Sequence, residues 1–240
     1  MMGGFEGSPP PFESQEYAVT LDNVSKRYPE AEPGRRALDD LSLGVRKGRF
    51  CAVMGPPKSG KTTLLHCMAG LVRPSSGTVR WGHAEADSIG VVRTDDLPHP
   101  GASVRDFVSA RPEGPERSDR EVRNACRLAR LWPRRRDVRE LTPVQLKKAT
   151  LARALADSPR LLLVDEPPCT AGEEHSRVLG DIVRRAVRTL EVTAVMATDD
   201  PLAASRADSV VFLRDGRLVD AVAKASVEEI TDCLQFLGER

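Results

Sequence analysis

The segment that most constrains the fold is a loop over Gly55–Thr63, with the sequence GPPKSGKTT. It matches the phosphate-binding pattern G-x-x-x-x-G-K-[ST]. An apolar run, Phe50–Met54, precedes the loop, and a helix-like stretch, Leu64–Gly70, follows it. Because this pattern binds phosphate when it joins a strand to a helix, its context predicts an α/β domain built around a nucleotide site.

The residues of the loop suit an anion in different ways. Glycines allow close approach of the backbone, while loop N–H groups and the positive end of the following helix dipole face the phosphates. Lys61 adds a full charge at the outer oxygens, and Thr62 offers its hydroxyl to Mg²⁺. Pro57 cannot donate an N–H, and Lys58 places a long side chain where small residues are favoured. The predicted nucleotide-binding residues of the loop are Gly55, Lys58, Ser59, Gly60, Lys61, Thr62 and Thr63.

A second site element, Leu161–Glu166, is a continuous apolar run that ends in two acidic residues. Such a run fits a strand buried on both faces of a parallel sheet, and ligands bind at the carboxyl ends of these strands. We expect Asp165 to hold Mg²⁺ through water and Glu166 to polarise an attacking water. Alone, the pair could be an acidic turn, but the phosphate loop upstream favours the magnesium interpretation.

The composition is that of an ordinary globular chain. Its 240 residues are 40% hydrophobic and 30% charged, and the net charge of +1 gives no general attraction to nucleic acid. No apolar stretch approaches the roughly 20 residues of a membrane helix, and no signal sequence is recognisable, so we expect a cytoplasmic protein. The cysteines and histidines lack metal-ligand spacing.

The order of patterns along the chain predicts one domain. Residues 1–16 are rich in Gly, Pro and Ser and predict a disordered leader before a domain over 17–240. Tyr17–Leu21 and Leu41–Val45 are predicted strands of an antiparallel layer beside a parallel core. Helical spacing in an Arg-rich region over about 95–150 predicts a helical subdomain inserted in the core.

With both motifs in place, the chain resembles the ATP-binding subunits of ABC transporters over nearly all of 17–219. The segments that carry the resemblance are Val24–Tyr28, Leu64–Gly77, Ala152–Leu155 and the Asp-Gly hairpin around Leu213–Arg217. The sequences of these segments are most similar to those of the ATPases of lipoprotein-release and macrolide-export systems. The resemblance implies a P-loop NTPase core of ABC type, with a mostly parallel sheet, flanking helices, an antiparallel β-layer and the inserted helical subdomain.

The resemblance also implies cofactors and partners. ATP and Mg²⁺ would be bound, with Tyr28 stacking on adenine, although Tyr28 could instead be a strand-end aromatic that packs on its own sheet. The subunit would form a homodimer or heterodimer with an ABC ATPase subunit and contact a membrane permease. It would then lie peripherally on the cytoplasmic face of the cell membrane. No nucleic-acid partner is expected.

Several positions depart from the family pattern. The family signature L-S-G-G-Q aligns with Leu141–Gln145, where Pro143 removes a donor and Val144 blocks close approach. The residues at the other altered positions are Thr94 for the γ-phosphate-sensing glutamine, Gly172 for an aspartate, and Asp199 for the switch histidine. A carboxylate at Asp199 would repel the γ-phosphate. Nucleotide binding is therefore expected, and hydrolysis is left open.

Two functions follow from this pattern. The first is a transporter subunit that couples ATP binding, and slow hydrolysis, to transport by a permease. The second is a catalytically weak or inactive pseudo-ATPase that acts as a regulatory or structural partner of an active subunit. Soluble ABC proteins that act on ribosomes or DNA usually carry tandem cassettes or a coiled-coil insert, and this sequence shows neither.

Overall fold

The computed structural model describes most of the predicted domain. The described residues are 16–29, 36–82, 89–93, 99, 101–111, 114–132, 137–165 and 173–238, with the side chains of 173–176 and 238 excepted. The predicted leader lies outside them apart from residue 16, and its disorder stays a prediction.

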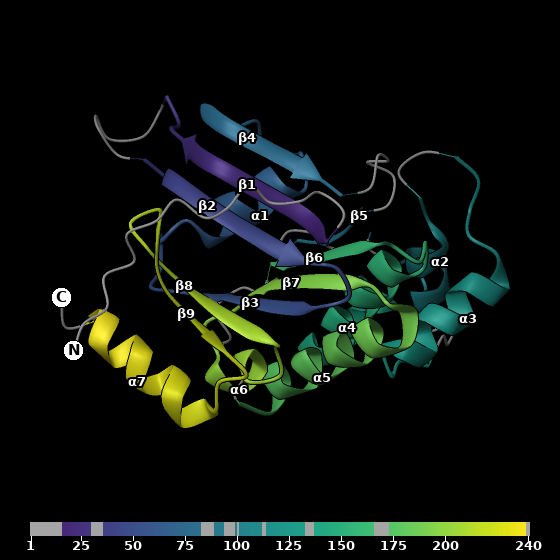
Figure 1. Ribbon diagram of the computed structural model, residues 1–240. Coiled ribbons are helices and arrows are strands. Elements are labelled where there is room, and N and C mark those ends of the chain that lie inside the picture. Colours follow the sequence, from purple (N-terminus) through teal and green to yellow (C-terminus); the bar gives the residue numbers. More distant parts are fainter. Residues whose placement is uncertain are drawn as a thin grey trace.

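The central element is a six-stranded sheet with the order β5-β6-β7-β3-β8-β9 (Figure 1). Neighbours from β5 to β8 pair in parallel, whereas β9 pairs with β8 in the antiparallel sense. The mostly parallel core predicted from the sequence is thus confirmed. The strands are β3 (Phe50–Met54), β5 (Ile89–Val92), β6 (Leu161–Asp165), β7 (Thr193–Ala197), β8 (Ser209–Arg214) and β9 (Arg217–Ala223).

A three-stranded antiparallel sheet forms the predicted second layer. Its order is β2-β1-β4, with β1 at Tyr17–Lys26, β2 at Leu38–Arg46 and β4 at Ser76–Trp81. Strand β1 continues well beyond the predicted segment, which ended at Leu21. A register shift follows Leu21, and Asn23 within it has φ +48°. Such a bulge interrupts the alternation of inward and outward side chains. The period-2 pattern therefore hid the second half of the strand.

The helices cover both faces of the six-stranded sheet. Figure 1 shows α1 between the two sheets and α4, α5 and α6 on the opposite face of the larger sheet. Within the described part of the chain, no helix is both long enough and apolar enough to cross a membrane. The helices are α1 (Lys61–Met68), α2 (Val104–Ser109), α3 (Asp119–Leu128), α4 (Pro143–Leu155), α5 (Glu173–Leu190), α6 (Pro201–Ala204) and α7 (Val227–Gly238), with a 3₁₀ turn, η2, at Val138–Glu140.

Two regions of helix bear on the sequence predictions. Helices α2, α3 and most of α4 lie in the region expected to be helical, but the boundaries of an inserted subdomain stay a prediction. The sequence analysis did not identify α7. Its residues Ile230, Cys233, Leu234 and Leu237 follow helical spacing and pack in or against the main core.

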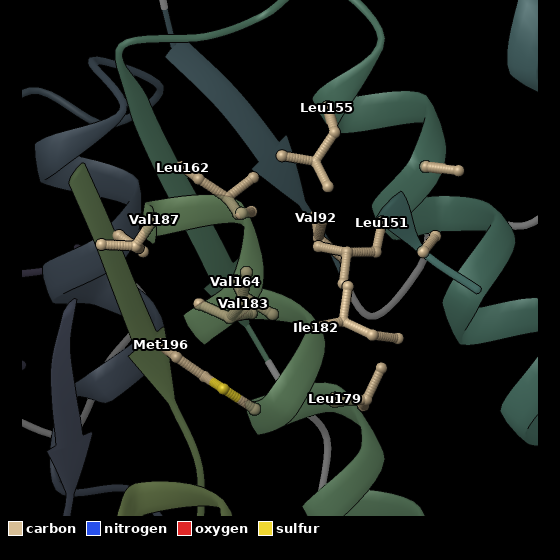
Figure 2. Close-up of a cluster of buried hydrophobic side chains, with 14 of the residues drawn as sticks. Val92, Leu151, Leu155, Leu162, Val164, Leu179, Ile182, Val183, Val187 and Met196 are labelled. Atoms are coloured by element: carbon tan, nitrogen blue, oxygen red, sulfur yellow. The ribbon is translucent and has the colours of Figure 1, made fainter. Parts of the chain in front are cut away.

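The parallel strands divide the core into two halves. In β3, Phe50 and Met54 belong to the cluster shared with α4 and α5, whereas Cys51 and Val53 belong to the cluster shared with α1 and the antiparallel sheet. Successive side chains of a strand point to opposite faces, so a strand covered on both sides must be apolar throughout. Figure 2 shows the first half, where side chains of α5 such as Ile182 lie beside the strands.

We expect Leu162→Ala, in β6, to lower the free energy of unfolding by about 3 kcal/mol, because the lost side chain leaves a cavity. Leu162 is 0% exposed in the core that supports the end of this strand. Leu71→Ala is the matched control, since Leu71 is 53% exposed and should change stability by less than about 0.5 kcal/mol. Urea unfolding followed by circular dichroism measures both, and equal losses would contradict the assignment of Leu162 to the core.

Candidate functional site

The carboxyl ends of three adjacent strands form the candidate site. In the sheet, β7 lies between β6 and β3, so Asp165, the chain after Ala197 and the phosphate loop emerge side by side. The backbone N–H of Thr198 donates to Val53 O at 3.1 Å and joins two of these ends. This edge of a parallel sheet is where α/β folds bind ligands. The tertiary structure brings the two predicted motifs together.

The loop lies tightly against the backbone behind it. A Cβ at Gly55 would stand 2.0 Å from Leu213 O, and one at Gly60 would stand 2.3 Å from Ala37 O. Gly60 also has φ +109°, a conformation that L side chains rarely adopt. Only glycine fits at these positions, so the β8 end and the start of β2 fix the path of the loop.

The N-terminus of α1 is open to an anion. Its N-cap is Gly60, no side chain among the described residues caps it, and its first turn has no acidic residue. The first N–H groups of a helix have no partner within the helix, and the helix dipole makes this end positive. By contrast, α2, α3 and α4 each close their N-terminus with a capping box. The end of α1 is therefore suited to a phosphate group.

Ser59 is a second feature of the loop that suits an anion. The residue is 2% exposed, and its Oγ has no hydrogen-bond partner within the described residues. Its carbonyl accepts a hydrogen bond of 2.9 Å from Gly216 N, in the turn between β8 and β9. A buried polar group without a partner costs about 1–3 kcal/mol, so a phosphate oxygen that accepts from this hydroxyl would stabilise the site.

Lys61 has three acceptors in the structure. Its Nζ donates to Gly55 O at 2.6 Å and to Pro56 O at 3.2 Å, and it lies 2.9 Å from Asp199 Oδ1. A lysine ammonium has three N–H donors, so these contacts use its full capacity. The sequence analysis expected Asp199 to act on the γ-phosphate, but it missed the contact with Lys61. The only signal was the acidic residue itself, because no local pattern joins residues so far apart in the chain.

Thr62 and Asp165 form the pair expected at a magnesium site. Asp165 is buried at the end of β6 and accepts a hydrogen bond from the Thr62 side chain. Burial raises the pKa of Asp165, and the bond from Thr62 and the charge of Lys61 oppose this effect. A hydroxyl beside a carboxylate fits Mg²⁺, which usually binds one or two protein ligands together with substrate phosphates. The donor set present is therefore compatible with a Mg-nucleotide.

Three other predicted site residues lie outside the described residues. They are Thr94, Glu166 and Gly172. The role of Glu166 in polarising water stays a prediction.

Tyr28 lies on the side of the molecule where the loop is found. It follows β1, and Lys26 Nζ stands 5.0 Å from its ring centroid. The Lys26 carbonyl accepts a hydrogen bond of 2.8 Å from Ala37 N, and the Ala37 carbonyl in turn lies against Gly60. A cation near the ring is a favourable contact in itself. Stacking on adenine and packing on the sheet both remain open for this residue.

The altered signature forms a closed helix end at the start of α4. Thr142 is the N-cap, its Oγ1 accepts from Gln145 N at 3.3 Å, and Thr142 N donates to Gln145 Oε1 at 3.0 Å. Pro143 occupies the first turn and has no N–H. Of the first three positions of α4, Pro143 thus has no N–H and the Gln145 N–H is already bonded to Thr142. This end therefore has less to offer a phosphate than the end of α1.

Together these features define the class of the protein as a P-loop nucleotide-binding domain with an added antiparallel sheet. The sequence profile of the family described as "ABC transporter" matches residues 38–168. The chain belongs to the ABC transporter family, as the resemblance predicted. Both the recognition and the fold class are thereby confirmed.

Known relatives align with most of the chain. It is 28% identical to "ABC transporter ATP-binding protein YxdL" of Bacillus subtilis over 92% of the chain and 94% of that relative. It is 30% identical to "Macrolide export ATP-binding/permease protein MacB" of Salmonella choleraesuis over 84% of the chain and 34% of that relative. It spans only 17% of the first curated relative, "ABC multidrug transporter MDR2" of Trichophyton equinum, at 29% identity.

A solved structure shares the fold. The one described as "Dimeric Structure of MJ0796, a Bacterial ABC Transporter Cassette" superimposes with a TM-score of 0.74. The alignment covers 87% of this chain and 99% of that chain at 23% identity. At this identity the likeness supports the architecture alone.

Lys58 combines a strained backbone with an exposed cation, at φ +66° in the loop. We expect Lys58→Gly to raise the free energy of unfolding by about 0.5–1 kcal/mol, because glycine removes a left-handed penalty of about 1–2 kcal/mol but loses more entropy on folding. Lys224→Gly is the matched control, since Lys224 also has positive φ, at +50°, and lies in no site element. Thermal unfolding measures stability.

The same two variants test whether Lys58 contacts a nucleotide. If it does, Lys58→Gly should weaken ATP binding by about 3- to 10-fold through the lost charge, and Lys224→Gly should not. Titration calorimetry measures the affinities. Equal affinities for both variants and the unaltered chain would remove Lys58 from the set of phosphate-binding residues.

Proposed function

We propose that the chain is the ATP-binding subunit of an ABC transporter and couples the binding of Mg-ATP to transport by a membrane permease. The observation that carries the proposal is the uncapped N-terminus of α1 beside Lys61 and the Thr62–Asp165 pair. A helix end with free N–H groups, a lysine and a hydroxyl–carboxylate pair are together what a magnesium-bound triphosphate requires. The subunit would pair with another ABC subunit and bind the permease at the cytoplasmic face of the membrane.

Each site residue has a role in this proposal. Lys61 would balance the phosphate charge, and the buried Ser59 hydroxyl would donate to a phosphate oxygen. Thr62 and Asp165 would hold Mg²⁺, which would neutralise charge on the phosphates. Tyr28 would stack on adenine. These residues account for binding, and none of them by itself requires rapid turnover.

Hydrolysis is the weaker part of the function. The N-terminus of α4 supports a poor signature, because Pro143 has no N–H to offer and Val144 places a side chain where the family has glycine. In the ABC family each composite site uses the loop of one subunit and the signature of the other. The contact of Asp199 with Lys61 further weakens the site for a triphosphate. These observations favour the second candidate, a pseudo-ATPase partner of an active subunit, if turnover proves negligible.

Removing the lysine should abolish tight nucleotide binding. We expect Lys61→Ala to weaken binding of Mg-ATP by about 10- to 100-fold, the size of one or two lost hydrogen bonds to a charged group. Lys224→Ala removes the same charge outside the site and should leave the affinity unchanged. Calorimetric titration of the purified chain is the measurement. Identical behaviour of Lys61→Ala and the unaltered chain would sink the proposed binding function.

Steady-state phosphate release distinguishes the two candidate functions. In the first, the chain releases phosphate slowly, alone or with a partner subunit, and Glu166→Gln abolishes the release because the water loses its polarising carboxylate. Turnover that disappears in Glu166→Gln would rule out the pseudo-ATPase. Absence of turnover with any partner, in a chain that still binds Mg-ATP, would rule out the enzyme and leave the regulatory or structural role.

A further inference from the structure

We propose that Asp199 makes this site favour a nucleoside diphosphate over a triphosphate, by holding Lys61 where a terminal phosphate would otherwise contact it. The proposal rests on the proposed function, because it assumes that nucleotide binds at the loop. It assigns Asp199 a role in specificity. The Asp199 carboxylate would place a fixed negative charge beside the position of the γ-phosphate.

The contact is a direct pair of opposite charges. Asp199 Oδ1 lies 2.9 Å from Lys61 Nζ, and the side chains are 34% and 12% exposed, respectively. Gly55 O and Pro56 O also accept from this ammonium, so among the described residues its three N–H groups already face three acceptors. An incoming phosphate must therefore replace at least one of these acceptors.

The backbone on both sides of Asp199 is anchored. Before it, Thr198 N donates to Val53 O at 3.1 Å, at the end of β3. After it, Asp200 N donates to Thr198 Oγ1 at 3.1 Å, and Asp200 Oδ1 accepts from Leu202 N at 2.7 Å as the N-cap of α6. Asp199 is thus tied to the edge of the sheet that carries the loop. A bound triphosphate can turn its side chain aside, but it cannot easily move the residue away.

The two nucleotides differ in how many N–H donors of the Lys61 ammonium their phosphate groups use. The lysine of a phosphate loop reaches the β- and γ-phosphates. A diphosphate needs one of the three N–H donors and leaves two for Asp199 and a backbone carbonyl, whereas a triphosphate needs two and leaves Asp199 beside the γ-phosphate on the same ammonium. Acceptors that share one ammonium lie roughly 4–5 Å apart, so a γ-phosphate beside Asp199 would bring like charges close together. A diphosphate lacks that group and avoids most of the repulsion.

The test is calorimetric titration with ADP and with ATP, in EDTA so that Mg²⁺ does not mask the carboxylate. The unaltered chain should bind ADP at least as tightly as ATP. Asp199→Asn keeps the shape of the side chain and removes its charge, and it should raise the affinity for ATP by about 10- to 100-fold. Its effect on ADP should be less than about threefold, because one place on Lys61 is enough for a diphosphate.

Asp200→Asn is the matched control. It removes the same charge from the neighbouring residue, and asparagine caps a helix as well as aspartate does, so α6 should be preserved. This variant should leave the ratio of ADP to ATP affinity within about twofold of the unaltered chain, if a direct contact with Lys61 is what matters. Thermal unfolding of all three proteins should give similar midpoints.

The outcomes separate this inference from the function on which it rests. Equal changes in ADP and ATP affinity in Asp199→Asn would overturn the role in specificity while leaving nucleotide binding intact. Equal changes in Asp199→Asn and Asp200→Asn would also overturn it. The change in affinity would then come from the loss of any negative charge near the site and not from the contact between Asp199 and Lys61. If neither nucleotide binds to the unaltered chain or to any variant, in EDTA or with Mg²⁺ present, the proposed function fails together with the inference.

Discussion

The placement of β3 between β7 and β8, covered on both faces, is the constraint on which the rest of the structure depends. Its alternate side chains belong to two different cores, and its end leads directly into the phosphate loop. The neighbouring strands then fix the loop, through Thr198 N on one side and the Leu213 carbonyl on the other. The backbone behind Gly55 and Gly60 leaves no room for a side chain at these positions, so the loop follows a path that only glycine permits.

Two helix ends of the chain differ in what they offer an anion. The N-terminus of α1 lacks a cap and points its free donors into a site that holds Lys61 and Asp165, whereas the N-terminus of α4 is closed by Thr142 and Gln145. The first arrangement favours an anion, and the second has fewer donors to offer, because Pro143 has no N–H and the Gln145 N–H is bonded to Thr142. The two ends are therefore suited to different degrees to bind a phosphate group.

Sequence patterns predicted most of the fold where periodicity was unbroken. The apolar runs of β3 and β6, the Asp215-Gly216 hairpin turn and the helical region were recognisable, and the structure contains them. The pattern failed in the second half of β1, where the bulge near Asn23 shifts the register. For the site, the loop residues and Asp165 could be found from motifs. Their supports, such as the Leu213 carbonyl behind Gly55, could not, because backbone contacts between distant segments leave no mark in local sequence.

The sequence by itself determined the family, the chemistry of the loop and the presence of unusual residues at Pro143 and Asp199. It determined these because each depends on residue type and local spacing. Only the tertiary structure decided that Asp199 contacts Lys61, that the buried Ser59 Oγ has no hydrogen-bond partner among the described residues, and that Thr142 caps the start of α4. Distances and burial arise from the pairing of β7 with β3 and from the packing of whole elements, so they are settled only when the chain is folded.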